Sequence, residues 1–330
     1  MRNNPKPLHW GIALSLLTCL GPVTYVHGDE VTRGWLDRMG RAVEELSYQG
    51  SFVHTDGGRS QSMGVAHRVD DGNVYERLWS LDGPNREFIR KNNEVKCIFS
   101  DHREVVFEQV QGNSGYGLQV PEFSPALERL YRLVSHDEEE RIAGRSTQVV
   151  EIIPEDRYRY GYKMWLDIET AMPLRFDLVN EKGEAVETTQ FIGIDFREVE
   201  ESELTQELSV EGYRHHAAAS NGAADSNIDV PWQVGELPPG FYRTSATKDD
   251  LPNQEGELTH MTYSDGLATV SVFVEPLGDD DQPVLRGLSK KMNAYGIVAR
   301  GADGNYQVTV MGEVPRLTLR NIGESIRQTH

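Results

Sequence analysis

The spacing of apolar and polar residues changes along the chain, and it predicts one helix followed by a long series of strands. Over residues 31–46 the apolar side chains recur at helical spacing, which is typical of an amphipathic helix with a charged outer face. From residue 47 to about residue 110 the spacing becomes two, and Asp-Gly and Asn-Asn dipeptides separate the short apolar runs. This part of the chain therefore predicts an antiparallel meander.

A second helix is predicted over residues 124–134, where Ser124 is a suitable N-cap and Pro125 would take the first helical position. Beyond it the alternating pattern returns. It predicts strands over residues 146–153, 157–167, 173–180 and 185–196. Together with the meander, these strands would form one large curved antiparallel sheet.

The composition changes after residue 197 and indicates a boundary between two domains. Acidic residues crowd segment 198–211, and small polar residues with almost nothing to bury follow them. After Pro231 a smaller unit of strands begins, and Pro315 opens a terminal helix. Its predicted strands cover residues 240–247, 257–263, 267–275, 295–301 and 305–314. We therefore expect an α+β fold with two unlike domains.

The N-terminus has the pattern of a cleaved secretory signal. Arg2 and Lys6 precede the apolar run at residues 10–20, which is too short to cross a bilayer that needs about 20 residues. After cleavage Cys97 is the only thiol, so no intramolecular disulfide can form, and we expect Cys97 in the core. The predicted organisation is a signal peptide at 1–28, a large domain at 29–211, a linker at 212–230 and a small domain at 231–330.

The charge of the chain limits its partners. Lys and Arg number 33 against 52 Asp and Glu, a net charge of −19, which argues against general nucleic-acid binding. An anionic ligand would have to meet a local basic patch. The mean hydropathy of −0.52 excludes a polytopic membrane protein.

Motifs for catalysis or metal binding are weak. The glycine-rich stretch at 112–117 lacks dinucleotide spacing, and His215-His216 has no third ligand at metal-site spacing. The acidic run at 279–281 is not followed by ordered oxygen ligands, and no serine lies in a G-x-S-x-G elbow. We therefore expect no catalytic residue, no enzyme activity, no cofactor and no metal.

The predicted strand at 157–167 alternates basic with aromatic and apolar side chains, which would place them on opposite faces. An ordinary half-buried strand explains this pattern. Alternatively, the aromatic face lines a concavity for acyl chains, while cations meet lipid phosphate. The lipid-cavity candidates are Tyr158, Tyr160, Tyr162, Met164 and Leu166. The lipid-phosphate candidates are Arg157, Arg159, Lys163, Arg286, Lys290 and Lys291.

An ordered set of short motifs runs through nearly the whole mature chain. They are QGSFV at 49–53, PEDRYRYGY at 154–162, WLD at 165–167, NEKG at 180–183, LPPGF at 237–241, YSDGLA at 263–268, SVFVEP at 271–276 and GEVP at 312–315. In their order and similar spacing these motifs resemble the MucB/RseB family of periplasmic regulators of the envelope-stress sigma factor.

The resemblance implies a fold and a function. The large domain would be a LolA/LolB-like open half-barrel with helices across its opening, joined to a smaller α+β domain. The family binds the periplasmic domain of a single-pass anti-sigma factor and shields it from a DegS-type site-1 protease, which keeps the stress response off. Lipopolysaccharide or another lipid displaces the regulator. The resemblance thus implies a periplasmic, non-enzymatic negative regulator.

Several questions stay open at this point. A periplasmic carrier or scavenger of lipid or lipoprotein would also suit the large domain, although it would not need the second one. The sequence does not define which residues contact the partner. It also leaves open the identity of the lipid and whether the protein forms a homo-oligomer. The partner-binding candidates are Tyr263, Asp265, Leu267 and Phe273, although a hairpin turn at Asp265-Gly266 and a small core explain these residues more simply.

Overall fold

The protein is described from a computed structural model that covers residues 26–109, 123–217, 228–250, 256–278, 282–289 and 293–329. The predicted signal peptide lies outside these residues except for 26–28. The glycine-rich stretch at 112–117, the acidic run at 279–281, and both Lys290 and Lys291 also lie outside them. Within the described chain no helix has the length and apolar character that crossing a membrane requires.

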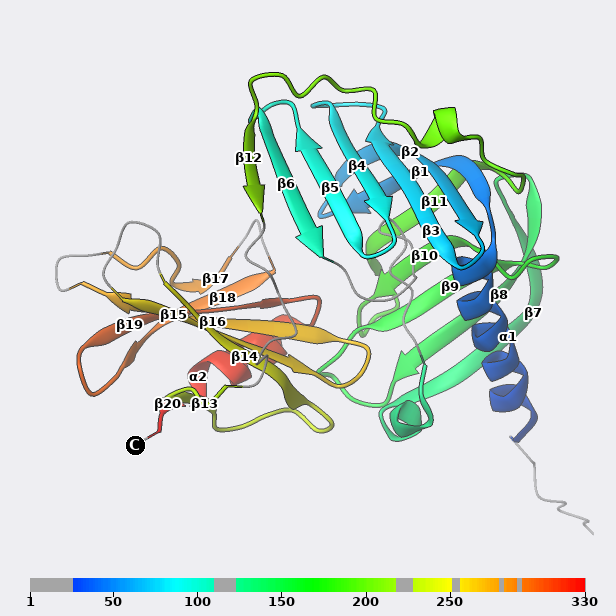
Figure 1. Ribbon diagram of the computed structural model, residues 1–330. Coiled ribbons are helices and arrows are strands. Elements are labelled where there is room, and N and C mark those ends of the chain that lie inside the picture. Colours follow the sequence, from blue (N-terminus) through cyan, green and yellow to red (C-terminus); the bar gives the residue numbers. More distant parts are fainter. Residues whose placement is uncertain are drawn as a thin grey trace, which may run out of the picture.

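The N-terminal domain is one twelve-stranded sheet. Its strands are β1 (Tyr48–Asp56), β2 (Arg59–Asp70), β3 (Asn73–Ser80), β4 (Arg86–Lys91), β5 (Glu94–Phe99), β6 (Glu104–Gln109), β7 (Tyr131–Ile142), β8 (Arg145–Pro154), β9 (Gly161–Asp167), β10 (Pro173–Val179), β11 (Ala185–Asp195) and β12 (Arg214–Ala217). They lie in the order β12-β6-β5-β4-β3-β2-β1-β11-β10-β9-β8-β7. Within the described residues the two end strands, β12 and β7, do not pair with each other, so the strongly curved sheet stays open (Figure 1). This confirms the predicted large open half-barrel.

Helix α1 (Val26–Glu45) confirms the helix predicted from the first apolar pattern and lies beside β7 (Figure 1). Its apolar face serves two parts of the core. Leu36 and Met39 pack with side chains of β7, β8 and β9, whereas Val43 joins a cluster that includes Phe52 of β1. Burying these side chains stabilises the helix on the sheet, at about 1.5–3 kcal/mol for each large one.

The second predicted helix was wrong. A short 3-10 helix, η1 (Pro125–Arg129), uses the predicted Ser124–Pro125 start, but the chain then enters the long strand β7. Tyr131 and Leu133 are buried while Arg132 between them is exposed, so the local period is two. Pairing with β8 along the edge of the sheet outweighs the helical propensity of this segment.

The strand predicted over 157–167 was also too long, because β9 begins only at Gly161. The residues just before β9 form a turn that Asp156 stabilises. Its Oδ1 accepts hydrogen bonds from the backbone N–H of Tyr158 at 2.8 Å and from Nε of Arg159 at 3.1 Å. Aspartate favours such side-chain turns because its short carboxylate reaches the backbone two residues on. Arg157 and Arg159 therefore do not share a strand face with Lys163.

The acidic segment that approaches the predicted linker is packed on the large sheet. The 3-10 helix η2 (Glu201–Leu204) lies here, and Val199 and Leu204 form a small buried cluster with Ala66 of β2. Farther on, β12 pairs in parallel with β6. Residues 214–217 of the predicted linker are thus an edge strand of the N-terminal sheet.

The C-terminal domain confirms the predicted smaller α+β unit. Its elements are β13 (Trp232–Val234), β14 (Tyr242–Asp250), β15 (Glu257–Ser264), β16 (Thr269–Leu277), β17 (Gly287–Leu288), β18 (Ala294–Arg300), β19 (Asn305–Gly312), α2 (Arg316–Glu324) and β20 (Ile326–Gln328). A six-stranded sheet runs β14-β15-β16-β19-β18-β17, and β13 pairs with β20. Leu319 and Ile322 of α2 pack on one face of this six-stranded sheet, against Val270, Val272 and Val310.

Candidate functional site

The two domains meet at a buried ion pair between Arg159 and Asp265, which we call the interdomain pair. The side chains of both residues are 0% exposed. Arg159 donates from Nη1 to Oδ2 of Asp265 and from Nη2 to the backbone oxygen of Pro239 in the C-terminal domain. Within its own domain it pairs with Asp156 at 3.0 Å, and the hydroxyl of Tyr131 donates to Asp265 at 2.9 Å. The arginine thus bridges turns of both domains.

Tight turns present both charges. Asp265 lies in the β15–β16 hairpin, where its Oδ1 accepts the backbone N–H groups of Leu267 and Ala268 at 2.8 Å each. Gly266 takes a φ of 105°, which an L side chain rarely adopts. The Asp-Gly pair that signalled a hairpin therefore also fixes the carboxylate that faces Arg159.

Aromatic rings enclose the guanidinium. Its central carbon lies 5.5 Å from the ring centre of Tyr131 and 5.3 Å from that of Phe241. Such cation–π contacts strengthen when water is excluded. Burial and the neighbouring Asp265 charge raise the pKa of Tyr131 well above its ordinary value, so its hydroxyl remains a donor to Asp265.

Further contacts surround the interdomain pair. Oγ1 of Thr318 on α2 donates to the backbone oxygen of Tyr158 at 2.6 Å. Gly240 lies so close to Leu130 that an added Cβ would be 2.5 Å from its Cδ1, and one at Gly266 would be 3.2 Å from Leu127 Cδ2. The C-terminal turns therefore fit closely against η1 and the residue that follows it.

Burial and neighbouring charges raise the pKa of ionisable side chains elsewhere between the domains. Burial, followed by the charges of Glu313 and Asp56, raises the pKa of Glu187 on β11 to about 7. His54 Nε2 lies 3.7 Å from Glu187 Oε1. Burial and then the charges of Glu313, Asp265 and Glu187 raise the pKa of Tyr162. The domain contact thus combines an attractive buried pair with a repulsive pair of glutamates.

The lipid-cavity candidates are largely core residues. Met164 and Leu166 are fully buried and Tyr162 is 7% exposed. They pack in one cluster with Leu36 and Met39 of α1. Tyr160 is half-buried against the same cluster, whereas Tyr158 lies in the turn before β9. Side chains of the helix therefore cover the apolar face of this strand.

The lipid-phosphate candidates do not form one basic face. The expectation that Arg159 is available to a phosphate was wrong, because the interdomain pair buries its guanidinium. Arg157 is exposed in the turn, while Lys163 pairs with Glu151 at 3.3 Å. Arg286 is exposed in the chain before β17.

The partner-binding candidates fall into two groups. Tyr263 and Asp265 are buried, and Leu267 packs against the cluster beneath α1, so these residues serve the C-terminal core and the domain contact. Phe273 is half-buried and stacks on the ring of His260, with 4.3 Å between ring centres. Sequence reasoning missed the pairing of Arg159 with Asp265, because the two lie 106 residues apart.

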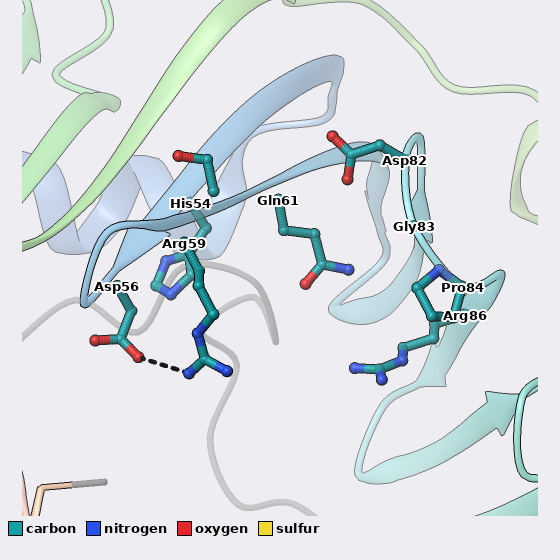
Figure 2. Close-up of a pocket in the computed structure, with 9 residues that line it drawn as sticks. His54, Asp56, Arg59, Gln61, Asp82, Gly83, Pro84 and Arg86 are labelled. Atoms are coloured by element: carbon teal, nitrogen blue, oxygen red, sulfur yellow. Dashed lines mark ion pairs between the residues drawn. The ribbon is translucent and has the colours of Figure 1, made fainter. Parts of the chain in front are cut away.

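A polar cavity of about 410 Å³ lies between the β1–β2 and β3–β4 turns, and none of the candidate residues above is among those that line it. Figure 2 shows the side chains of Arg59 and Arg86 beside it, together with the acidic Asp56 and Asp82. Arg59 reaches Asp56 at 3.8 Å. Since these charges balance, the cavity has no clear preference for an anion or a cation.

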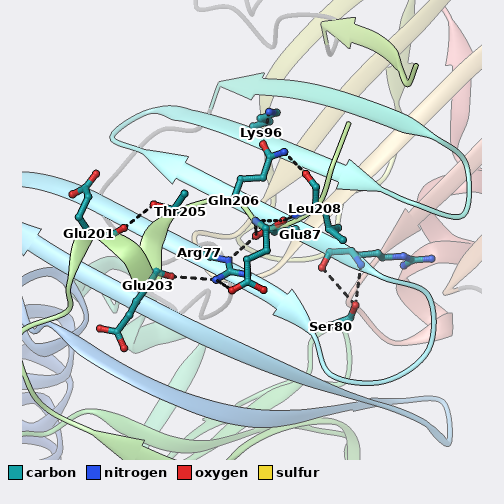
Figure 3. A network of polar contacts seen from close by, with 11 residues as sticks. Arg77, Ser80, Glu87, Lys96, Glu201, Glu203, Thr205, Gln206 and Leu208 are labelled. Atoms are coloured by element: carbon teal, nitrogen blue, oxygen red, sulfur yellow. Dashed lines mark hydrogen bonds and ion pairs between the residues drawn. The ribbon is translucent and has the colours of Figure 1, made fainter. Parts of the chain in front are cut away.

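A second buried ion pair lies wholly within the N-terminal domain (Figure 3). Arg77 Nε donates to Glu87 Oε1 at 2.6 Å, and their side chains are 6% and 1% exposed. The segment 197–208, which we call the strap, crosses this pair. Glu87 accepts the strap's backbone N–H groups of Glu207 at 3.0 Å and Leu208 at 2.9 Å. This pair therefore fastens the strap to the large sheet.

Comparisons with known proteins match the whole architecture. The family model of the MucB/RseB N-terminal domain matches residues 32–208, and that of the MucB/RseB C-terminal domain matches residues 226–327. The "Sigma factor AlgU regulatory protein MucB" of Pseudomonas aeruginosa is 32% identical over 322 residues, which are 95% of this chain and 96% of that protein.

Solved structures agree with this relationship. The complex structure of Pseudomonas aeruginosa MucA/MucB contains a chain that matches with a TM-score of 0.71 at 31% identity, over 91% of this chain and 99% of the other. A crystal structure of MucB matches with a TM-score of 0.62 at the same identity and the same coverage. Both domains of the present chain thus have counterparts in one relative, in the same order. The chain belongs to the MucB/RseB family.

Proposed function

We propose that this protein binds the periplasmic domain of a single-pass anti-sigma factor and restrains an envelope-stress sigma factor. The observation that carries the proposal is the match over both domains to MucB, a regulatory protein of sigma factor AlgU that is seen in complex with MucA. The match favours a non-enzymatic regulator that works in the periplasm. A carrier of lipid or lipoprotein is less supported, because the similarity extends through the C-terminal domain.

The proposed regulation acts through occupancy. While the protein is bound, it covers the anti-sigma factor and protects it from a DegS-type site-1 protease. Lipopolysaccharide or another lipid lowers the affinity and releases the partner, which by linkage requires that lipid and partner favour different states of the protein.

The lipid site in this proposal involves the strand β9. Acyl chains that reach Tyr162, Met164 and Leu166 would have to exchange for the side chains of α1 that cover them. Arg157, Lys163 and Arg286 would supply the cations for phosphate, since each side chain reaches solvent. Phe273 is the partner-binding candidate that an incoming protein could contact most directly.

A binding titration tests the proposal. The full mature chain is titrated into the purified periplasmic domain of the anti-sigma factor, and site-1 cleavage is followed in parallel. We expect saturable binding, protection from cleavage, and loss of both when lipopolysaccharide is added. Absence of binding at saturating protein would refute the regulatory function. A transfer assay with labelled acyl lipid, without the anti-sigma factor, tests the carrier function separately.

A further inference from the structure

The interdomain pair defines how the two domains sit against each other. The hydrogen bonds of Arg159 and Asp265 described above are made to side chains and turn atoms, outside any strand ladder, and both side chains are 0% exposed. A buried charge that loses its partner is strongly unfavourable, so such a pair is either formed with its full geometry or avoided. The pair therefore favours one discrete arrangement of the domains.

The contacts around the pair leave little room for intermediate positions. Gly240 and Gly266 both have positive φ, and each lies against a leucine that belongs to the N-terminal domain. A small sliding movement would drive these turns into Leu130 or Leu127. Closely packed interfaces of this kind switch between arrangements and do not deform continuously.

An opposing force acts at the same domain contact. Glu187 of the N-terminal domain is electrostatically coupled to Glu313 of the C-terminal domain, and like charges disfavour close approach. The last strand of the N-terminal domain, β12, ends at Ala217. The described part of the C-terminal domain begins at Ile228. The charge of Glu313 therefore opposes ionisation of Glu187, whereas the interdomain pair is held by direct hydrogen bonds.

We propose that Arg159 is a positioning residue for partner binding: paired with Asp265, it holds the two-domain arrangement that recognises the anti-sigma factor. This inference rests on the proposed function and adds its regulation. The partner need not touch either residue. The present structure matches a chain of the MucA/MucB complex with a TM-score of 0.71 and a crystal structure of MucB with 0.62, at equal identity and coverage, which is a difference between those two structures.

The size of the effect follows from the population of the competent arrangement. Apparent affinity falls in proportion to the fraction of molecules that adopt the binding arrangement. If breaking the pair leaves roughly 1–10% of molecules so arranged, affinity falls about 10- to 100-fold. Any ligand that opens the pair would release the partner by the same relation.

The test compares Asp265→Asn, which keeps the shape of the side chain but removes its charge, with Arg77→Met. Arg77→Met breaks the buried ion pair with Glu87 inside one domain and serves as the matched control. Spin labels at Ile192→Cys in β11 and Val284→Cys in the C-terminal domain report the domain separation, since these side chains are 60% and 91% exposed. Affinity for the anti-sigma periplasmic domain is measured on the unlabelled full chain.

We expect Asp265→Asn to broaden the label-to-label distance distribution and to weaken binding about 10- to 100-fold. Arg77→Met should change neither. Tyr131→Phe removes only one hydrogen bond to Asp265, so it should shift both readouts in the same direction by less, in a chain that retains the pair.

Three results would overturn the inference: unaltered affinity in Asp265→Asn, an unaltered distance distribution in that variant, or an equal loss of affinity in Arg77→Met. If the unsubstituted protein itself fails to bind the anti-sigma factor, the proposed function fails. The distance measurement then still decides whether the pair holds the domains together. The two failures are therefore distinguishable.

Discussion

Two buried arginine–carboxylate pairs in this protein have nearly the same chemistry and different consequences. Arg77 and Glu87 lie ten residues apart in sequence, on the paired strands β3 and β4. Arg159 and Asp265 lie 106 residues apart, and the hydrogen bonds of Arg159 extend to turns of two domains. The strand ladder already places the first pair, whereas no ladder places the second. The first pair therefore stabilises one domain, and the second selects an arrangement of two.

The surroundings of the two pairs strengthen this contrast. Around Arg77 and Glu87 the additional bonds come from the strap, which belongs to the same domain. Around the interdomain pair the forces oppose one another, because Glu187 and Glu313 repel each other elsewhere in the contact. Separating the two domains would therefore break the second pair and leave the first intact.

The largest effect on stability is expected from breaking the Arg77–Glu87 pair, which lies within a single domain. Glu87→Ala should lower the free energy of unfolding of the N-terminal domain by about 3–5 kcal/mol, because Arg77 and the backbone N–H groups of Glu207 and Leu208 lose their acceptor. Urea unfolding followed by tryptophan fluorescence measures it. Glu94→Ala on the neighbouring strand β5, where the side chain is exposed, is the control. A loss below about 1 kcal/mol would contradict the role given to this pair.

The next largest effect concerns the repulsive glutamates and depends on pH. The pKa of Glu187 is raised to about 7, so the folded state holds this proton more tightly than the unfolded state. The charged form therefore opposes folding; the cost is absent below the ordinary pKa and complete above pH 7. Glu187→Gln should raise stability by about 3 kcal/mol at pH 8 and by less than about 1 kcal/mol at pH 5.

Unfolding curves at several pH values, for the protein and for Glu187→Gln, measure this difference. The groups that face Glu187 are His54, Asp56 and Glu313, and the carboxylates among them raise its pKa. Glu184→Gln, at an exposed position in the turn before β11, is a suitable control. A gain that is equal at pH 5 and pH 8 would show that the charge of Glu187 is not responsible.

A smaller effect is expected from an alanine at Gly240, and comparison with Gly83 distinguishes backbone strain from a steric clash between the domains. Gly240→Ala places a Cβ 2.5 Å from Leu130 Cδ1 at a φ of 83°, while Gly83→Ala meets nothing within 4 Å at a φ of 67°. Both substitutions should cost about 1–2 kcal/mol of stability from the left-handed backbone. Only Gly240→Ala should also broaden the distribution of distances between the domains. Equal distributions in both variants would show that the contact of the new Cβ with Leu130 does not separate the domains.

The sequence predicted the elements better than it predicted the contact between domains. The helix pattern that includes Leu36 and Met39 was long enough to identify α1, and the Asp265-Gly266 dipeptide marked a real hairpin. The helix expected at 124–134 was wrong because a short apolar pattern fits either period, and pairing with β8 decided it. The strand expected from residue 157 failed at the Asp156 turn.

The position of one candidate residue, Arg159, was wrong for a related reason. Alternation along a strand suggested that Arg159 faces solvent, but its position depends on Asp265, Pro239 and Phe241, which lie far away in the sequence. A charged residue is rarely buried unless it is paired, and a single sequence does not reveal the pairing. The buried state of Cys97, by contrast, was predicted from its apolar neighbours and is confirmed.

The smallest effect tests whether a neutral hydrogen bond between the domains shares the role of the charged pair. Thr318→Val keeps the shape of the side chain but removes the 2.6 Å bond to the backbone oxygen of Tyr158, which should cost about 1 kcal/mol. Thr244→Val removes a similar 3.2 Å bond inside the C-terminal domain and is the control. If the interdomain pair alone sets the arrangement, both variants keep the native distance distribution between the domains. A broadened distribution in Thr318→Val would mean that the arrangement is shared among several contacts, and the contrast between the two ion pairs would then be one of degree.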